Sequence, residues 1–121
     1  QRTVLVIEDN ASNLALIQAL VARRPAWQLV TATDGPAGIA RAMEIKPELI
    51  LLDLNLPGLG GEAVLAALRA DRSLAGLRIV IVSADAQPDT MARLRAAGAD
   101  DYLTKPLAVS RVLALLDRPT P

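Results

Sequence analysis

The sequence contains no cysteine and no histidine among its 121 residues. Without cysteine, disulfide scaffolds, thiol nucleophiles and thiolate metal sites are excluded, and without histidine, imidazole ligands and the commonest general base are excluded. Neither sign of charge is in excess, since 13 Lys and Arg balance 13 Asp and Glu, so no overall field favours nucleic acid or an anionic membrane as partner. Any chemistry must therefore depend on carboxylates, hydroxyls and lysine.

Long hydrophobic runs are also missing. The longest apolar runs fall well short of a membrane span, and no basic leader followed by an apolar block precedes the first strand-like segment. We therefore expect a cytoplasmic protein with no membrane contact. The length and the 52% of hydrophobic residues suit one compact domain, which we place at residues 1–118 with a short tail at 119–121.

Two kinds of segment alternate along the chain. Short segments rich in Val, Ile and Leu predict parallel strands covered on both faces, at residues 3–8, 27–32, 48–53, 78–83 and 101–104. Between and after them, apolar residues recur at helical spacing, as at Leu14, Ile17 and Leu20 or at Val109, Val112 and Leu116. This fivefold alternation predicts an α/β fold, a single doubly wound, flavodoxin-like (βα)5 domain whose five-stranded parallel sheet has the order 2-1-3-4-5.

Capping signals support the helix positions. Asp34 precedes Pro36 and predicts a helix start, Asp89 suits an N-cap, and Gly98 suits the position just after a helix end. These residues separate the predicted helices from the strands on either side.

Polar side chains gather at the predicted carboxyl ends of the strands. Glu8 and Asp9 follow the first strand, Asp53 ends the third, Ser83 ends the fourth and Lys105 follows the fifth. In the predicted order the first and third strands are neighbours, so the three carboxylates should crowd together. Either a proton is trapped among them, which raises a pKa, or a cation neutralises them. Oxygen ligands alone indicate a hard ion, and Mg²⁺ fits best.

Each of these residues has an ordinary explanation when taken alone. Glu8 and Asp9 could be the polar end of a strand, Asp53 a turn residue ahead of Pro57, and Lys105 a solvated lysine before a loop proline. Their joint appearance at four strand ends, with no polar residue in the interiors of those four strands, favours a functional site.

The motifs that carry these residues resemble the receiver domain of two-component signalling, the family that includes the chemotaxis response regulators. The resemblance covers residues 4–10, 50–53, 81–84 and 98–106, and so nearly the whole chain. It implies that Asp53 is phosphorylated by a histidine kinase or a histidine phosphotransfer domain, with Glu8 and Asp9 serving Mg²⁺ and Asn55 adding its backbone carbonyl.

The resemblance also implies a switch. Ser83 would be the switch hydroxyl, Lys105 the phosphoryl-binding lysine in a cis Lys105–Pro106 peptide, and Tyr102 an aromatic that rotates into the space vacated behind Ser83. A downstream effector protein would read the result. Asp85 falls where the family varies its dephosphorylation rate, and it could orient water or repel it.

Two other functions remain as alternatives. A phosphohydrolase of the haloacid dehalogenase type would need a second carboxylate where Asn55 stands, and 121 residues leave no room for a cap. A phosphorylation-independent interaction module would be expected to lose Asp53, Lys105 or the acidic pair, and none is lost.

The larger protein is a separate question. The sequence predicts no enzyme activity beyond self-phosphorylation and dephosphorylation at Asp53, and no direct nucleic acid contact. The first predicted strand leads into Glu8, Asp9 and Asn10, as in receivers of hybrid kinases that this chain resembles, and the given sequence ends directly after the last predicted helix. Both features favour the receiver of a hybrid sensor histidine kinase or a stand-alone regulator over a transcription factor.

Overall fold

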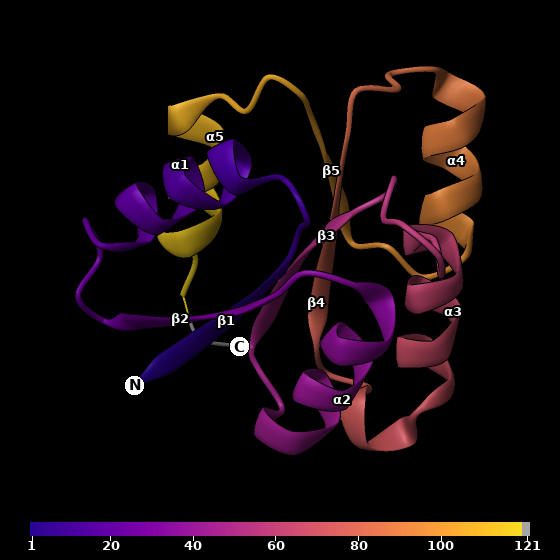
Figure 1. Cartoon of the computed structure of the whole chain (residues 1–121), viewed down its shortest axis with the longest axis horizontal. Helices are drawn as coiled ribbons and strands as arrows, with labels where there is room; N and C mark the ends of the chain where they lie inside the picture. The colour runs from indigo at the N-terminus through magenta and orange to yellow at the C-terminus, as the bar shows by residue number, and fades with distance from the viewer. Residues whose placement is uncertain (120–121) are drawn as a thin grey trace.

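A computed structural model describes residues 1–119 of the chain as a five-stranded parallel sheet covered by helices (Figure 1). The strand order is β2-β1-β3-β4-β5, which confirms the predicted doubly wound α/β fold. The strands are β1 (Arg2–Ile7), β2 (Trp27–Ala32), β3 (Leu49–Asp53), β4 (Arg78–Ser83) and β5 (Asp101–Thr104). The predicted tail at 119–121 lies largely outside the described residues, since residues 120–121 are not among them.

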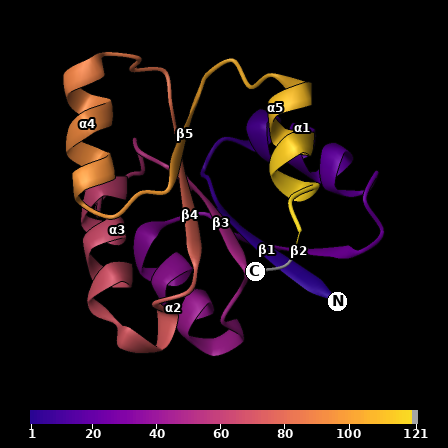
Figure 2. The same cartoon turned by 180° about the vertical axis from the view of Figure 1, so that it is seen from behind.

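The helices form one layer on each face of the sheet. Helices α1 and α5 cover one face, whereas α2, α3 and α4 cover the other, as both views show (Figures 1 and 2). Their bounds are α1 (Ala11–Val21), α2 (Gly35–Ile45), α3 (Gly61–Ala70), α4 (Pro88–Ala96) and α5 (Val109–Leu116). A short 3-10 helix, η1 (Arg72–Leu74), which the sequence did not predict, precedes β4.

Alternate residues of each central strand enter different layers of the core. In β1, Leu5 and Ile7 pack on the side of α2 to α4, while Val4 and Val6 pack on the side of α1 and α5. All of β3 is buried in the same manner. The continuous apolar runs in the sequence exist because both faces of these strands are covered.

The capping predictions have mixed outcomes. Asp34 accepts a hydrogen bond of 2.8 Å from the Ala37 amide at the start of α2, and Gly98 lies just past α4 with a φ of 114°, so both predictions are confirmed. The prediction for Asp89 is wrong, because Pro88 already occupies the first turn of α4 and the N-cap is Gln87.

Helix α5 buries the predicted face at Val112 and Leu116 but not at Val109. Val109 is 42% exposed, whereas Val112, Leu115 and Leu116 are buried. The indole of Trp27 donates a hydrogen bond of 2.8 Å to the Leu116 carbonyl and thereby fixes the end of this helix against β2.

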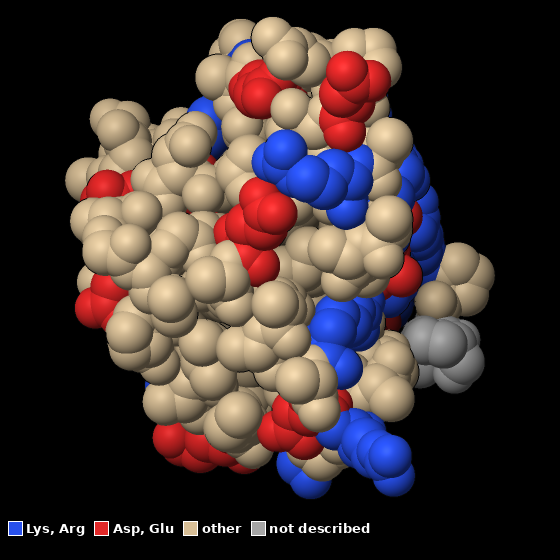
Figure 3. All heavy atoms as spheres, turned by 90° about the vertical axis from the view of Figure 1, so that its right-hand side faces the viewer, with Lys and Arg blue, Asp and Glu red and all other residues tan. Residues whose placement is uncertain are grey.

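The surface carries both signs of charge. On the side where α3 and α4 lie, basic and acidic side chains are interspersed (Figure 3), and Arg93 of α4 pairs with Glu62 of α3 at 3.1 Å. Within residues 1–119, no helix has the length and apolar composition needed to cross a membrane.

Candidate functional site

The register of the sheet brings the predicted polar residues to one edge. Ile7 of β1 lies beside Leu52 of β3, so Glu8 emerges next to Asp53. Asp53 in turn lies beside Val82, which precedes Ser83 in β4. Because all five strands are parallel, their carboxyl ends meet there.

Three carboxylates come together at this edge. One oxygen from each of Glu8, Asp9 and Asp53 lies within 4.8 Å of the other two. Glu8 is 2% exposed and Asp53 is 3% exposed, whereas Asp9 is open to solvent. Two buried acids beside one exposed acid form a half-open site that solutes can reach from one side.

The start of α1 holds the Glu8 carboxylate. Oε2 accepts a hydrogen bond of 3.2 Å from the Asn10 amide, and Oε1 accepts one of 3.2 Å from the side chain of Asn13. Asn10 also caps α1, because its side chain accepts from the Asn13 amide at 3.0 Å. The turn after β1 therefore fixes both oxygens of Glu8.

Lys105 supplies the positive charge of the site. Its Nζ lies 3.4 Å from Oε1 of Glu8 and 3.4 Å from Oδ1 of Asp53. The Lys105 amide donates a hydrogen bond of 2.9 Å to the Ser83 carbonyl, and its peptide bond to Pro106 is cis. One ammonium group thus faces two buried carboxylates.

The remaining negative charge affects Glu8. Burial raises the pKa of this carboxyl, and the neighbouring Asp53, which a protonated Glu8 could donate to, raises it further, while the Asn10 amide and Lys105 oppose the shift. The site would therefore gain from a further cation.

The donor set fits a magnesium ion. It consists of oxygens only, and ligands 2.0–2.1 Å from a magnesium ion lie about 3–4 Å apart, close to the spacing of the three carboxylates. Glu8, Asp9 and Asp53 supply these oxygens, and a contribution from the backbone carbonyl of Asn55 remains a prediction.

The loop after β3 supports Asp53. Oδ1 accepts a hydrogen bond of 3.1 Å from the Asn55 amide. Gly61, at the start of α3, packs against this loop so closely that a Cβ atom there would lie 2.4 Å from the Asp53 carbonyl oxygen. The close approach of α3 therefore fixes the backbone that carries the carboxylate.

The predicted switch residues lie behind this site. Ser83 is fully buried, and its Oγ accepts a hydrogen bond of 3.1 Å from the Asp85 amide. Tyr102 is 2% exposed, so its ring already lies inside, and its hydroxyl donates to the Asp85 carbonyl at 2.6 Å. The predicted inward rotation of Tyr102 does not describe this conformation, in which there is no outward ring to move.

Two contributors to the site were not predicted as such. Asn13 holds Glu8, and Thr90 donates from its hydroxyl to Oδ2 of Asp85 at 3.0 Å. Asn13 follows the cap Asn10 by three residues, which is a usable signal for a helix start. A single sequence carries no comparable signal for Thr90.

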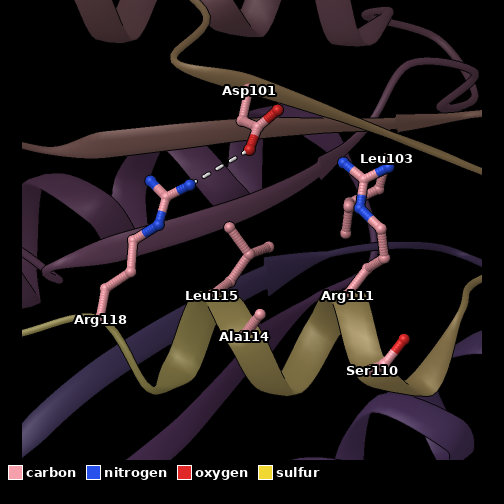
Figure 4. A pocket seen from close by; sticks show the side chains of 7 residues that line it. All are labelled: Asp101, Leu103, Ser110, Arg111, Ala114, Leu115 and Arg118. Carbon is pink, nitrogen blue, oxygen red and sulfur yellow. Dashed lines mark hydrogen bonds and ion pairs between the residues drawn. The ribbon is translucent and has the colours of Figure 1, made fainter.

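A pocket of about 300 Å³ lies elsewhere, between β5 and α5 (Figure 4). Leu103 and Leu115 form its apolar wall, Arg111 lies at one end, and Arg118 pairs with Asp101 at 3.4 Å at the other. It shares no residue with the carboxylate edge. The pocket is lined by a single acid, Asp101, whereas the carboxylate edge brings three acids and a lysine together.

Comparison with known proteins agrees with this geometry. The response regulator receiver domain matches residues 4–117. The chain belongs to the response regulator receiver family. It is therefore a receiver domain of two-component signalling, as its sequence predicts.

Two relatives of this receiver domain are named as transcriptional or DNA-binding regulators. Transcriptional regulatory protein PrrA of Mycobacterium tuberculosis is 38% identical over 119 residues, which cover 95% of this chain and 50% of PrrA. DNA-binding response regulator MtrA of Mycobacterium leprae is 36% identical over 122 residues, which cover 98% of this chain and 52% of MtrA. The receiver domain thus spans about half the length of these relatives.

Solved structures agree in fold. Chemotaxis protein CheY4 of Vibrio cholerae superposes with a TM-score of 0.88 at 24% identity, covering 98% of each chain. The receiver domain of a sensor histidine kinase from Pseudomonas aeruginosa has a TM-score of 0.85 at 27% identity, and covers 97% of this chain and 95% of its own. That structure has a magnesium ion coordinated in its active site cleft.

Proposed function

We propose that Asp53 accepts a phosphoryl group from a phosphohistidine and returns it to water. The observation that supports this role most strongly is the position of the Asp53 carboxylate, which is buried at 3% exposure with Lys105 Nζ 3.4 Å from its Oδ1. Because the chain contains no histidine, the donor must be another protein or domain, a histidine kinase or a histidine phosphotransfer domain.

The reaction is an in-line displacement at phosphorus. A carboxylate oxygen of Asp53 forms the new bond to phosphorus while the phosphorus–nitrogen bond of the donor breaks, and the imidazole nitrogen keeps that electron pair. Lys105 would neutralise a phosphoryl oxygen as it approaches two carboxylates. The product is an acyl phosphate, which water hydrolyses, so the modification suits a reversible signal.

The acidic residues would serve a metal. Magnesium, when held by Glu8, Asp9, Asp53 and the backbone carbonyl of Asn55, supplies charge neutralisation for the incoming phosphoryl group. Glu8 is held for this role by Asn10 and Asn13. Ser83 would donate its hydroxyl to the phosphoryl group, and an effector protein would then recognise the changed surface.

The test is the intact mass of the chain after incubation with acetyl phosphate, with and without Mg²⁺, for wild type and Asp53→Asn. We expect a magnesium-dependent gain of one phosphate in wild type only. Failure of the wild type to gain mass would favour the second candidate, a phosphorylation-independent interaction module built on the receiver fold.

The names of the relatives suggest the class of the larger protein to which this domain belongs. PrrA and MtrA are named as transcriptional and DNA-binding regulators, and this chain covers half of each. We propose a DNA-binding regulator as the parent, in place of the hybrid kinase or stand-alone regulator that the sequence favours, with a cytoplasmic location. The reading frame beyond Pro121 tests this, because it would encode a DNA-binding domain, a kinase segment or a stop.

A further inference from the structure

Asp85 contacts both predicted switch residues through its backbone. Its amide donates a hydrogen bond of 3.1 Å to Oγ of Ser83, and its carbonyl accepts one of 2.6 Å from the hydroxyl of Tyr102. Ser83 and Tyr102 belong to neighbouring strands, β4 and β5, and both are buried. A single peptide segment therefore sets the positions of both side chains.

The Asp85 side chain fixes that segment to α4. Oδ1 accepts a hydrogen bond of 2.9 Å from the Gln87 amide, and Oδ2 accepts one of 3.0 Å from the hydroxyl of Thr90. The Gln87 side chain makes no capping hydrogen bond of its own, so Asp85 takes over part of the cap. Both carboxylate oxygens thus accept a hydrogen bond from the start of α4, which holds the Asp85 side chain against that helix.

The direction of the Ser83 hydrogen bond matters for the chemistry. A serine hydroxyl carries one hydrogen and two lone pairs. Because Oγ of Ser83 accepts from the Asp85 amide, its own hydrogen is free to be donated elsewhere. The hydroxyl can therefore donate to a phosphoryl oxygen on Asp53 without giving up its contact with Asp85.

We propose that Asp85 is a positioning residue that presets the switch of this receiver domain before phosphorylation. Held by Thr90 and the Gln87 amide, it keeps the Ser83 hydroxyl ready to donate and the Tyr102 ring inside. The inference rests on the proposed role of Asp53 as phosphoacceptor. When the reactive conformation of a receiver already predominates, little of its apparent affinity for a phosphoryl donor is lost in populating that conformation.

The chain offers a direct probe of this conformation, since Tyr102 is its single tyrosine. Replacement of tyrosine by 3-fluorotyrosine gives one fluorine resonance. We expect the unphosphorylated protein to show a buried resonance, with little difference between H2O and D2O, and only a small change on adding beryllium trifluoride as a phosphoryl mimic. A solvent-exposed resonance that becomes buried on adding the mimic would overturn the proposal.

Variants test the role of Asp85. In Asp85→Ala and Thr90→Val we expect an exposed or averaged resonance and, if the competent conformation falls to about a tenth of the population, about a tenfold slower mass gain from acetyl phosphate. Asp85→Asn and Thr90→Ser should restore much of both. Asp89→Ala removes an exposed acid from the same helix and should change neither. Thr90→Val keeps the size of the side chain and serves if Asp85→Ala does not fold. A buried resonance and an unchanged rate in both variants would refute the role of Asp85.

The two proposals fail differently. If wild type gains no phosphate, the proposed function is wrong, and the preset switch fails with it as a step of phosphorylation. If wild type gains phosphate while Tyr102 is exposed beforehand, only the preset switch is wrong. The fluorescence of the single tryptophan, Trp27, which lies in β2, reports whether each variant is folded.

Discussion

The ammonium of Lys105 lies 3.4 Å from Oδ1 of Asp53, with the two side chains 23% and 3% exposed. Little water separates them, so their attraction is stronger than that of a surface pair. Lys105 also lies 3.4 Å from Glu8, which places one positive charge between two buried acids. The carboxylate that would attack a phosphoryl group is therefore already beside the charge that would receive the group's oxygens.

Loss of the Lys105 charge should slow phosphorylation of Asp53 more than it weakens binding of the metal. For Lys105→Met we expect the rate of mass gain from acetyl phosphate to fall on the order of 10²-fold, the usual effect of removing one electrostatic contact to a transition state. Lys46→Met is the matched control, because Lys46 is the other lysine and lies exposed at the end of α2. Equal rates in the two variants would show that Lys105 does not contact the phosphoryl group.

Removal of the Asp53 charge should stabilise the fold. In Asp53→Asn the amide oxygen can still accept from the Asn55 amide, while the repulsion of Glu8 disappears. We expect a gain on the order of 1 kcal/mol at neutral pH without divalent ions, as is common for substitutions that relieve a functional site.

The pH dependence of that gain has a definite sign. The pKa of Glu8 in the folded protein is raised above its ordinary 4.5 by burial and by Asp53, so ionised Glu8 lowers stability at neutral pH. As the pH falls through the raised pKa, Glu8 takes up a proton and the advantage of Asp53→Asn should shrink. Thermal unfolding between acid and neutral pH measures this, with Asp89→Asn as the control. A less stable Asp53→Asn at neutral pH would mean that attraction to Lys105 outweighs the repulsion.

The sequence was sufficient to predict which residues meet, because their meeting depends only on topology. Glu8, Asp53, Ser83 and Lys105 each follow or end a strand, and parallel strands in the order 2-1-3-4-5 must bring these ends together. The apolar runs of β1, β3 and β4 require coverage on both faces whatever the details of packing. The fold and the composition of the edge therefore followed from chain order and hydrophobicity.

Side-chain directions could not be predicted in this way. Whether Tyr102 points inward depends on a hydrogen bond to the carbonyl of Asp85, 17 residues away in the chain. The sequence predicts that Asp89 caps α4, but Pro88 occupies the first turn, and the N-cap is Gln87, whose amide donates to Asp85. Rotamer and cap choices of this kind differ by only about 1 kcal/mol, which tertiary contacts easily exceed.

The opposite edge of the sheet should contribute to stability. Arg2 makes a bidentate ion pair with Glu48, and its guanidinium lies 4.3 Å from the centre of the Trp27 ring. Glu48 is also the nearest acid to the half-buried Arg78, at 3.8 Å. For Glu48→Gln we expect a loss of about 2 kcal/mol at neutral pH, below that of a fully buried pair because both partners keep some solvent contact.

Acid should lower the stability of wild type relative to Glu48→Gln, whereas it should raise the stability of wild type relative to Asp53→Asn. The hydrogen bond from Arg2 holds the pKa of Glu48 below its ordinary 4.5, so the ionised carboxylate stabilises the fold above that value. The difference between wild type and Glu48→Gln should therefore vanish as the pH falls through the lowered pKa. Denaturant unfolding at several pH values measures it. Glu44→Gln, which breaks the exposed pair with Arg41, should cost only about 0.3 kcal/mol, and an equal cost for both would contradict the prediction.

Two adjacent glycines should differ sharply in their tolerance of alanine. A Cβ on Gly61 would lie 2.4 Å from the carbonyl oxygen of Asp53, whereas a Cβ on Gly60 would meet no atom within 4 Å. Gly60 has a φ of −70°, which alanine adopts readily, so Gly60→Ala should be neutral or slightly stabilising.

Gly61→Ala must instead push α3 away from the loop after β3 or shift Asp53 itself. We expect a loss of about 1–3 kcal/mol, as for other overpacked positions, together with slower phosphorylation from acetyl phosphate. Unfolding midpoints and mass gain on the two variants measure both effects. Since the substitutions are one residue apart and add the same methyl group, a difference between them isolates the contact with Asp53, and equal behaviour would show that α3 can retreat without moving the carboxylate.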